Sequence, residues 1–384
     1  MAGSTYGKHF QITTWGESHG KGIGVVVDGC PAGLALCEND IQEYLDRRKP
    51  GKSKYSTQRQ EGDKVEILSG VFEGRTTGTP ISLIVFNEDQ RSRDYGDIAS
   101  YYRPGHADYT FDEKYGFRDY RGGGRSSGRE TIGRVAGGAI AIKILNELGI
   151  SLLTYSRAIG PVTIPQTAND LLSAWERHNI YRSLHEIQEL ILGNPLYMPD
   201  KESSKKAREY LDECMKHTDS AGGIVEGIIT GVPAGIGEPV FDKLDANLAK
   251  AIFSIGAVKG FEIGDGFAAA TAKGTENNDN FCINNGQITT ATNHAGGILG
   301  GISSGAPIIF RAAFKPTPSV ASTQQTVNKS GEEISISIHG RHDPIIVPRA
   351  VVVVECMAAL TLVDLLLENM GAKMEDLKKR YSCT

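Results

Sequence analysis

The sequence predicts an α+β protein, and three features carry this prediction. Short apolar runs with the β-branched composition of strands recur along the chain, for example at residues 81–86. An apolar segment at 131–148 is long enough for a buried helix and contains small residues that permit close packing. The two halves also repeat one pattern of strand, Pro-Ala-Gly turn and helix. Strands that flank buried, glycine-rich helices indicate this fold class.

The repeated pattern rests on two short matches. Residues 26–34 (VVDGCPAGL) align with 228–236 (IITGVPAGI), and residues 123–128 (GGRSSG) are echoed by 300–305 (GGISSG). Two matches in the same order favour a duplicated unit, although Pro-Ala-Gly and Gly-Gly are also common turn sequences. In a duplicated fold we expect the ligand site between the halves, where equivalent loops face each other.

Other elements follow from local patterns. Glu38, Asn39 and Asp40 predict the start of a short helix that ends at Pro50. The most apolar run, 351–367, contains two acidic residues and falls short of a membrane span, so we interpret it as a buried strand leading into a helix. We also expect a helix around 244–252 and strands at 23–27, 65–71, 224–229, 334–338 and 346–354.

The domain organisation follows from these elements. Residues 167–217 are polar with a helical pattern, which indicates a peripheral insertion. We therefore expect a single domain over 1–384, with a first half at about 6–150, a helical insertion at about 165–220 and a second half at about 221–370.

Charge is unevenly distributed in this chain of 384 residues, whose net charge is −5. Residues 47–59 hold six basic side chains and no acidic one, and residues 118–134 hold five arginines. An acidic protein with two concentrated basic stretches suits a compact anion better than a polyanion. The six scattered cysteines form no CxxC pair, which argues against a disulfide framework and suits a reducing cytoplasm. The N-terminal residues lack the apolar core of a secretory signal.

Residues 121–129 (RGGGRSSGR) predict an anion cradle. Three glycines free backbone N–H groups, Ser126 and Ser127 add hydroxyl donors, and Arg125 and Arg129 supply bidentate guanidinium groups. The predicted helix from Thr131 would point its N-terminal amides the same way. The alternative is an RGG-type tail that binds RNA; the apolar helix that follows favours the cradle.

Two histidines lie in glycine-containing loops beside basic residues. His19 belongs to residues 16–20 (GESHG) and His106 to residues 103–108 (RPGHAD). Such histidines suggest proton transfer or charge stabilisation near neutral pH, although a lone histidine is as often a structural residue. The adjacent Ser18 does not indicate a catalytic triad, because neighbouring residues rarely meet in the required geometry.

A third turn, residues 340–344 (GRHDP), contains Asp343, which is either a fixed carboxylate for proton transfer or a turn residue. His339 and His342 have no carboxylate or cysteine at a supporting spacing, so we predict no metal site. Residues 264–269 resemble a dinucleotide-binding fingerprint only superficially, because a loop follows instead of a helix, and we reject a Rossmann fold.

Residues 16–31, 124–135 and 341–355 resemble the three signatures of the chorismate synthase family, and the resemblance extends from about residue 6 to 367. It implies a β-α-β sandwich with an internal pseudo-twofold repeat, in which helices pack between antiparallel sheets. It also implies a homotetramer that uses reduced FMN. The implied reaction is the 1,4-elimination of phosphate from 5-enolpyruvylshikimate 3-phosphate to give chorismate, without net redox change.

The resemblance assigns roles residue by residue. His19 would protonate or stabilise the departing phosphate or the flavin, His106 would stabilise the reduced flavin ring, and Asp343 would assist proton transfer. The substrate-binding residues would be Arg48, Lys54, Arg103, Arg129, Arg134 and Arg341. The FMN-binding residues would be Arg125, Ser126, Ser127, Gly256, Ala257, Gly300, Lys315, Pro316, Thr317, Pro318, Ser319 and Arg341.

Some positions depart from the family pattern. Lys54 stands where many members carry arginine, which keeps the charge but loses the bidentate group, and Ile345 is bulkier than usual after Asp-Pro. Two alternatives stay open at this point: another flavin or nucleotide-phosphate enzyme, and an RNA-binding protein that stacks bases on Tyr55 and Tyr120. The rejected Rossmann fold favours a separate flavin reductase over reduction by NADPH on this chain.

Overall fold

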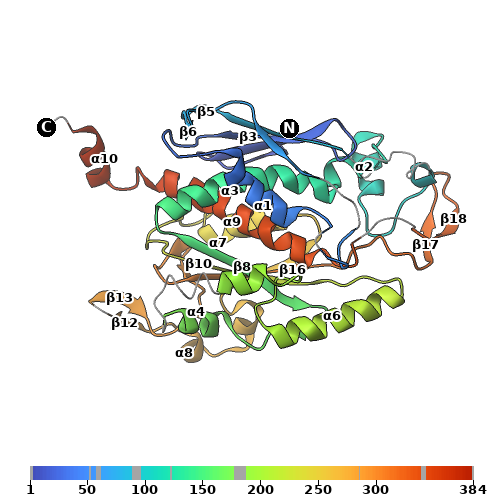
Figure 1. Cartoon of the computed structure of the whole chain (residues 1–384). Coiled ribbons are helices and arrows are strands. Elements are labelled where there is room, and N and C mark those ends of the chain that lie inside the picture. Colours follow the sequence, from blue (N-terminus) through green and yellow to red (C-terminus); the bar gives the residue numbers. More distant parts are fainter. Residues whose placement is uncertain are drawn as a thin grey trace.

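The protein is a sandwich of two sheets with a layer of helices between them (Figure 1). The computed structural model describes residues 3–51, 53–57, 62–88, 97–121, 123–176, 187–284, 286–338 and 343–382. Each of the two large sheets has five strands, and all neighbouring strands in them are antiparallel. The prediction of an α+β fold with helices between antiparallel sheets is confirmed.

The first sheet is built from the N-terminal half, in the order β1-β2-β3-β7-β4. Ile81, Leu83 and Val85 alternate along β7 and are buried, because every second side chain of a strand points to the same face. The strands are β1 (Thr5–Tyr6), β2 (Gln11–Gly16), β3 (Gly22–Asp28), β4 (Val65–Ile67) and β7 (Ile81–Phe86). The strand predicted at 65–71 is therefore shorter than expected.

The second sheet is built from strands between residues 151 and 314, in the order β11-β16-β10-β8-β9. Its strands are β8 (Ser151–Ile159), β9 (Val162–Thr163), β10 (Gly223–Thr230), β11 (Val258–Ile263) and β16 (Ile308–Phe314). The turn after β10 leads into a helix, as the turn after β3 does in the first half. The repeated strand, turn and helix are thus present, while the domain limits given above stay a prediction.

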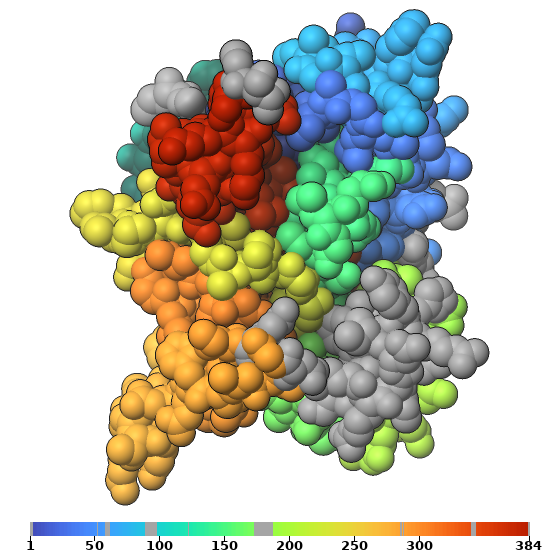
Figure 2. Space-filling model, turned by 90° about the vertical axis from the view of Figure 1, so that its left-hand side faces the viewer, coloured from blue at the N-terminus to red at the C-terminus, as the bar shows by residue number. Residues whose placement is uncertain are grey.

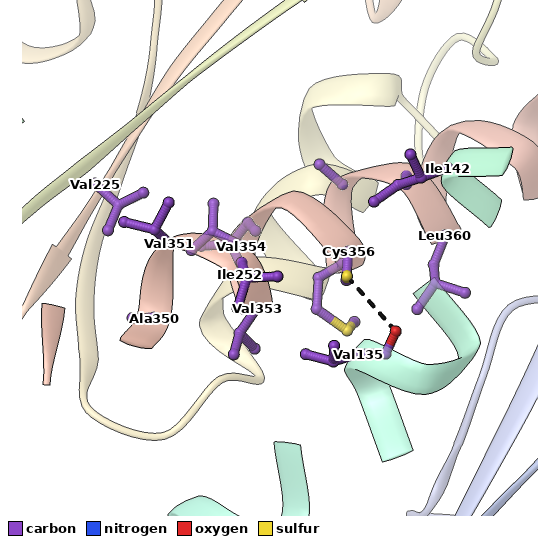
Figure 3. Packing of buried hydrophobic residues seen from close by; sticks show 14 of the residues in the cluster. Val135, Ile142, Val225, Ile252, Ala350, Val351, Val353, Val354, Cys356 and Leu360 are labelled. Carbon is purple, nitrogen blue, oxygen red and sulfur yellow. Dashed lines mark hydrogen bonds between the residues drawn. The ribbon is translucent and has the colours of Figure 1, made fainter. Parts of the chain in front are cut away.

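The helix layer packs through small residues. It contains α1 (Glu38–Arg48), α3 (Thr131–Glu147), α7 (Leu244–Phe253) and α9 (Val347–Asn369). A Cβ on Gly138 of α3 would lie 2.2 Å from Cys356 Cβ of α9, and one on Gly137 would lie 2.9 Å from Ile12 Cγ2 of the first sheet. Figure 3 shows another contact between α3 and α9, in which Cys356 Sγ lies 3.7 Å from the carbonyl oxygen of Val135. The predicted close packing of this helix is confirmed.

The strand predicted at 346–354, and again at the start of 351–367, is wrong. From Val347 onward these residues form the single helix α9, whose valines are individually poor helix formers. Pro348 sits in the first turn, where its fixed φ suits a helix, and burial between two sheets outweighs the propensity of the valines. By length and composition alone α9 could cross a membrane, since its most apolar window has a mean hydropathy of 2.3. However, 83% of that window is buried inside the protein, as in the core helix of a globular fold.

Smaller elements surround this sandwich. The hairpin β12–β13 projects from the left-hand side of the molecule in Figure 1, the side that faces the viewer in Figure 2. The peripheral helices are α2 (Asp108–Tyr115), α4 (Ala168–Glu176), α6 (Lys201–Lys216), α8 (Gly274–Asn277) and α10 (Met374–Tyr381). The hairpins pair β5 (Val71–Phe72) with β6 (Arg75–Thr76), β12 (Phe281–Asn284) with β13 (Gln287–Thr290), β14 (Ile298–Leu299) with β15 (Ile302–Ser303), and β17 (Gln324–Val327) with β18 (Glu333–Ile336). Five cysteines, at 30, 37, 214, 282 and 356, are free thiols, and Cys383 lies outside the described residues.

Candidate functional site

A buried cluster of charge lies at one end of the helix layer, on the right in Figure 1. Asp63, in the loop before β4, places Oδ2 2.6 Å from Arg48 Nη2 and Oδ1 3.1 Å from Arg129 Nη1. Arg48 ends α1, and Arg129 belongs to the 3₁₀ turn Gly128–Glu130 that leads into α3. The two predicted basic stretches therefore meet, and they meet on a carboxylate that the sequence analysis did not identify.

Burial and charge act in opposite directions in this cluster. The Asp63 side chain is 0% exposed, and burial alone would raise its pKa; Arg48 and Arg129 outweigh that effect and hold the pKa below its usual value. Burial lowers the pKa of Arg48 to about 10, with Arg349 and Arg129 adding to this effect and Asp63 opposing it. Arg48 is thus still a cation at neutral pH.

Asp343 is connected to the same cluster. It accepts a hydrogen bond from the backbone N–H of Thr57 at 2.7 Å and forms an ion pair with Arg349 Nη1 at 2.5 Å. Arg349, in the first turn of α9, donates from Nε to the carbonyl oxygen of Arg48 at 3.0 Å. The bulk of Ile345 is accommodated in the core, where its side chain is buried. Asp343 is therefore a fixed carboxylate linked through Arg349 to the end of α1, and its role in proton transfer stays a prediction.

The loop that carries His19 is tied to the cluster by Asn87. Asn87 Nδ2 donates to the carbonyl oxygens of Glu17 and Gly20 at 2.9 and 2.8 Å, while its Oδ1 accepts from Arg129 Nη2 at 2.8 Å. His19 is buried, and its Nδ1 lies 3.1 Å from Ser18 Oγ. One amide thus fixes a predicted catalytic histidine relative to a predicted substrate-binding arginine.

His106 lies against a different predicted segment, residues 315–319. Its Nε2 is 2.8 Å from Ser319 Oγ, and Lys315 Nζ donates to the carbonyl oxygen of Gly105 at 2.7 Å. A Cβ on Gly105, whose φ is 71°, would lie 2.8 Å from Pro318 Cβ, so only glycine fits this turn. The backbone N–H of Lys315 donates to the carbonyl oxygen of Ala257 at 3.0 Å, which brings 256–257 to the same place.

The predicted cradle uses its side chains mainly within the protein. Arg125 donates to Thr14 Oγ1 at 2.6 Å and to the carbonyl oxygen of Gly16 at 3.1 Å, so its guanidinium lies against β2. Ser126 Oγ donates to the carbonyl oxygen of Gly123, and Ser127 Oγ accepts the backbone N–H of Arg129. The arginine and both serines thus fix the loop ahead of α3 in shape.

Three predicted substrate-binding residues are engaged elsewhere. Arg103 forms a bidentate pair with Asp108, both contacts at 2.8 Å. Arg134 pairs with Glu130 at 2.8 Å and donates to Ser254 Oγ at 2.5 Å. Lys54 is 62% exposed and pairs with Asp212 of α6, where a hollow of about 420 Å³ opens. These contacts give Arg103 and Arg134 structural partners, while Lys54 lies on the outer surface.

Two further predicted residues stand apart. Gly300 lies in the turn between β14 and β15, and the neighbouring carbonyl oxygen of Gly301 accepts the N–H of Leu244 at the start of α7. Gly256 and Ala257 follow the C-terminal end of α7. Gly300 and these two residues therefore lie at opposite ends of this helix. Arg341, with His339 and His342, lies outside the described residues.

Sequence reasoning missed Asp63, Asn87, Arg349 and Thr57. A weak signal existed for Asp63, which follows a basic stretch that contains no acid. Asn87 comes directly after the predicted strand 81–86, a position where polar side chains often act. The other two carry no local signal, because their role depends on which loops converge. Among the described residues no His, Cys, Asp and Glu side chains gather as a metal site.

Comparisons with known proteins agree with the resemblance read from the sequence. A family model described as chorismate synthase matches residues 10–367. Chorismate synthase of Agathobacter rectalis is 66% identical over 381 residues, covering 99% of each chain, and that of Methanosarcina mazei is 54% identical over 96% of this chain and 97% of the relative. A solved structure described as chorismate synthase has a TM-score of 0.76 and 34% identity, covering 98% of this chain and 97% of that one.

Proposed function

The chain belongs to the chorismate synthase family of shikimate-pathway lyases, and we propose that it converts 5-enolpyruvylshikimate 3-phosphate to chorismate and phosphate. In this 1,4-elimination one C–H bond and the C–O bond to phosphate break, and the product gains a carbon–carbon double bond. The proposal includes reduced FMN, which is used without net redox change. The observation that carries it is the convergence of Arg48 and Arg129 on Asp63.

Charge explains why this cluster suits the proposed ligands. The phosphate and the two carboxylates of the substrate, together with the FMN phosphate, carry a charge of about −6. One contact between like charges at 4 Å costs ~4 kcal/mol at an effective dielectric near 20. Fixed cations are therefore needed. Arg48, Arg129 and Arg349 are held within one connected set of contacts that includes two carboxylates, Asp63 and Asp343. Three arginines and two carboxylates leave this set with a net positive charge that can bind an anion.

The residues around 315–319 fit a flavin phosphate and ring. Thr317 Oγ1 is buried and, in the part of the chain that the structure describes, has no hydrogen-bond partner. A Cβ on Gly256 would meet nothing within 4 Å, so the backbone there faces open space. Lys315, Thr317 and Ser319, with Gly256 and Ala257, would hold the cofactor. When bound, reduced FMN would supply an electron and accept a proton from a carbon too weakly acidic for histidine alone.

The chain's own groups would manage protons and charge. His106 is oriented by Ser319, so a protonated ring there would stabilise negative charge beside the segment 315–319. The loop that carries His19 is linked to Arg129 through Asn87, and His19 would hold a proton near the departing phosphate. Asp343, anchored by Thr57 and Arg349, would pass a proton at its carboxylate.

We further propose a cytoplasmic homotetramer that receives reduced flavin from a separate reductase. Phe281, Ile283 and Ile288 share one face of the hairpin β12–β13 and are 69%, 76% and 77% exposed, which supports coverage by another copy. Residues 266–271 form a 3₁₀ turn instead of a Rossmann helix, which supports an outside reductase. Light scattering tests the assembly, and a monomer at assay concentration would contradict it.

A flavin titration tests the main proposal. Purified protein is titrated with oxidised FMN, with and without 5-enolpyruvylshikimate 3-phosphate, while the flavin spectrum is recorded. We expect FMN binding that tightens with substrate, and chorismate formation once reduced FMN is supplied anaerobically. Salt-sensitive RNA binding without a change in the flavin spectrum would instead favour a nucleic-acid-binding protein.

A further inference from the structure

Asp63 has features that a simple loop residue does not need. Its side chain is fully buried, and its φ is 45°, in the left-handed region that non-glycine residues rarely adopt. Such a conformation persists when the surrounding contacts fix it, and it often marks a functional site. Here the left-handed backbone directs one carboxylate between Arg48 and Arg129, which come from distant parts of the chain.

The arginine donors around Asp63 are not fully used. Within the described residues, Arg48 Nε is buried and makes no hydrogen bond. In the part of the chain that the structure describes, the hydrogen bonds of Arg48 Nη1 are both long, at 3.4 Å, to the carbonyl oxygen of Gly128 and to Thr131 Oγ1. A buried guanidinium with unsatisfied donors is costly unless an anion completes its hydrogen bonds. The cluster therefore has donor capacity for a ligand as well as charge.

We infer that Asp63 is a positioning residue, which holds the guanidinium groups of Arg48 and Arg129 as one rigid pair that receives an anionic group of the substrate. Asp63 itself does not touch the substrate. Two neighbouring guanidinium groups repel each other, and a carboxylate between them removes the repulsion and fixes both orientations before the ligand arrives. The inference rests on the proposed function, because the anion is that of 5-enolpyruvylshikimate 3-phosphate.

Glu226 offers a matched control in the second sheet. It is a carboxylate with 2% exposure that also lies between two arginines, 3.4 Å from Arg311 Nη1 and 3.8 Å from Arg157 Nε. It accepts a further hydrogen bond from the hydroxyl of Tyr155. Neutralising Glu226 removes the same charge from a similar environment outside the candidate site, so it separates a loss of stability from a loss of ligand positioning.

The test compares Asp63→Asn with Glu226→Gln, each an almost isosteric change. We expect both variants to unfold at lower temperature than the wild type. Calorimetry of FMN-saturated protein with 5-enolpyruvylshikimate 3-phosphate should show a Kd raised at least about tenfold in Asp63→Asn, with a parallel rise in KM and a smaller change in kcat, because a buried charge partner has been lost. Glu226→Gln should keep the wild-type Kd.

The outcomes are distinguishable. A wild-type Kd in folded Asp63→Asn, while the wild type binds normally, overturns the inference alone. If the wild type does not bind this substrate, the proposed function is wrong and the inference falls with it. If Asp63→Asn does not fold, Asp63→Glu replaces it: this variant keeps the charge but moves the carboxylate by one methylene. We then expect a Kd raised at least about threefold, and an unchanged Kd overturns the inference.

Discussion

Two buried carboxylates of this protein have similar surroundings but reach them in different ways. Asp63 and Glu226 each lie between two arginines and are almost inaccessible to solvent. Glu226 sits on β10 directly opposite Tyr155 of β8 and Arg311 of β16, so strand register alone creates its contacts. Asp63 meets its arginines because a loop, a helix end and a 3₁₀ turn converge.

The charge balance of the two clusters also differs. Arg311 pairs with Glu262 of β11 at 3.0 Å as well as with Glu226, so this row of the second sheet holds two acids and, with Arg157, two bases. The charges in this row cancel, which suits a structural role. The Asp63 cluster, in contrast, carries more arginines than carboxylates. The excess charge on convergent loops, and not burial by itself, identifies the candidate ligand site.

The largest difference between the two clusters is expected in catalytic activity, when one arginine of each is replaced by lysine. Arg129 contacts Asp63 with one nitrogen and Asn87 with two others, a geometry that lysine cannot reproduce. We expect Arg129→Lys to lower kcat/KM at least about 10²-fold, measured anaerobically with reduced FMN.

Arg311→Lys is the control for that change. It removes the same bidentate group from the Glu226 row, where Arg311 contacts two carboxylates. We expect a lower melting temperature and a kcat/KM within about threefold of the wild type. An equal loss of activity in both variants would show that the two clusters do not differ in function.

A second prediction concerns the groups placed for proton transfer. His106→Ala and Asp343→Ala should leave the protein folded and slow turnover at least about 10²-fold, since general acid–base groups contribute on this scale. His106 lies against Ser319, and Asp343 is held by the backbone of Thr57 and by Arg349 of α9. Single-turnover rates and melting curves check this. A normal rate in either variant removes that residue from the mechanism.

Much of the fold could be predicted because its signals are local. The glycines at 137 and 138 indicated a closely packed helix, and the alternating residues of 81–86 indicated a strand. The helix α9 was mispredicted because its valines favour strands, and only burial between two sheets decides otherwise. The basic stretches that contain Arg48 and Arg129 could be recognised from charge clustering, while the predicted roles of these two residues came from the family resemblance. Asp63 could not, because its role depends on a left-handed backbone and on contacts far along the chain.

The smallest predicted effect is on the free energy of unfolding. The contribution of the Asp63 cluster should change in acid, and that of the Glu226 cluster in alkali. The pKa of Asp63 is held below its usual 3.8 despite burial, because Arg48 and Arg129 favour the ionised form. A lowered pKa stabilises the folded state above about pH 3.8, and this contribution is lost as the pH falls through the folded-state pKa. The stability difference between wild type and Asp63→Asn should therefore shrink in acid.

In the Glu226 cluster, the pH-dependent contribution to stability comes from Tyr155 and changes at alkaline pH. Burial, and then the neighbouring Glu226, raise the pKa of Tyr155 well above its usual 10.0, so its protonated form is favoured in the folded state. This contribution is complete below pH 10.0 and is lost as the pH rises through the folded-state pKa. Tyr155→Phe should cost about 1–2 kcal/mol of unfolding free energy at pH 7, leave activity unchanged, and lose its effect in alkali.

Urea unfolding followed by tryptophan fluorescence across this pH range would measure both differences. A difference for Asp63→Asn that does not vary with acid pH would mean that Asp63 is not ionised in the folded protein. The guanidinium groups of Arg48 and Arg129 would then have no counter-charge between them, and their repulsion would have to be relieved by the bound anion alone.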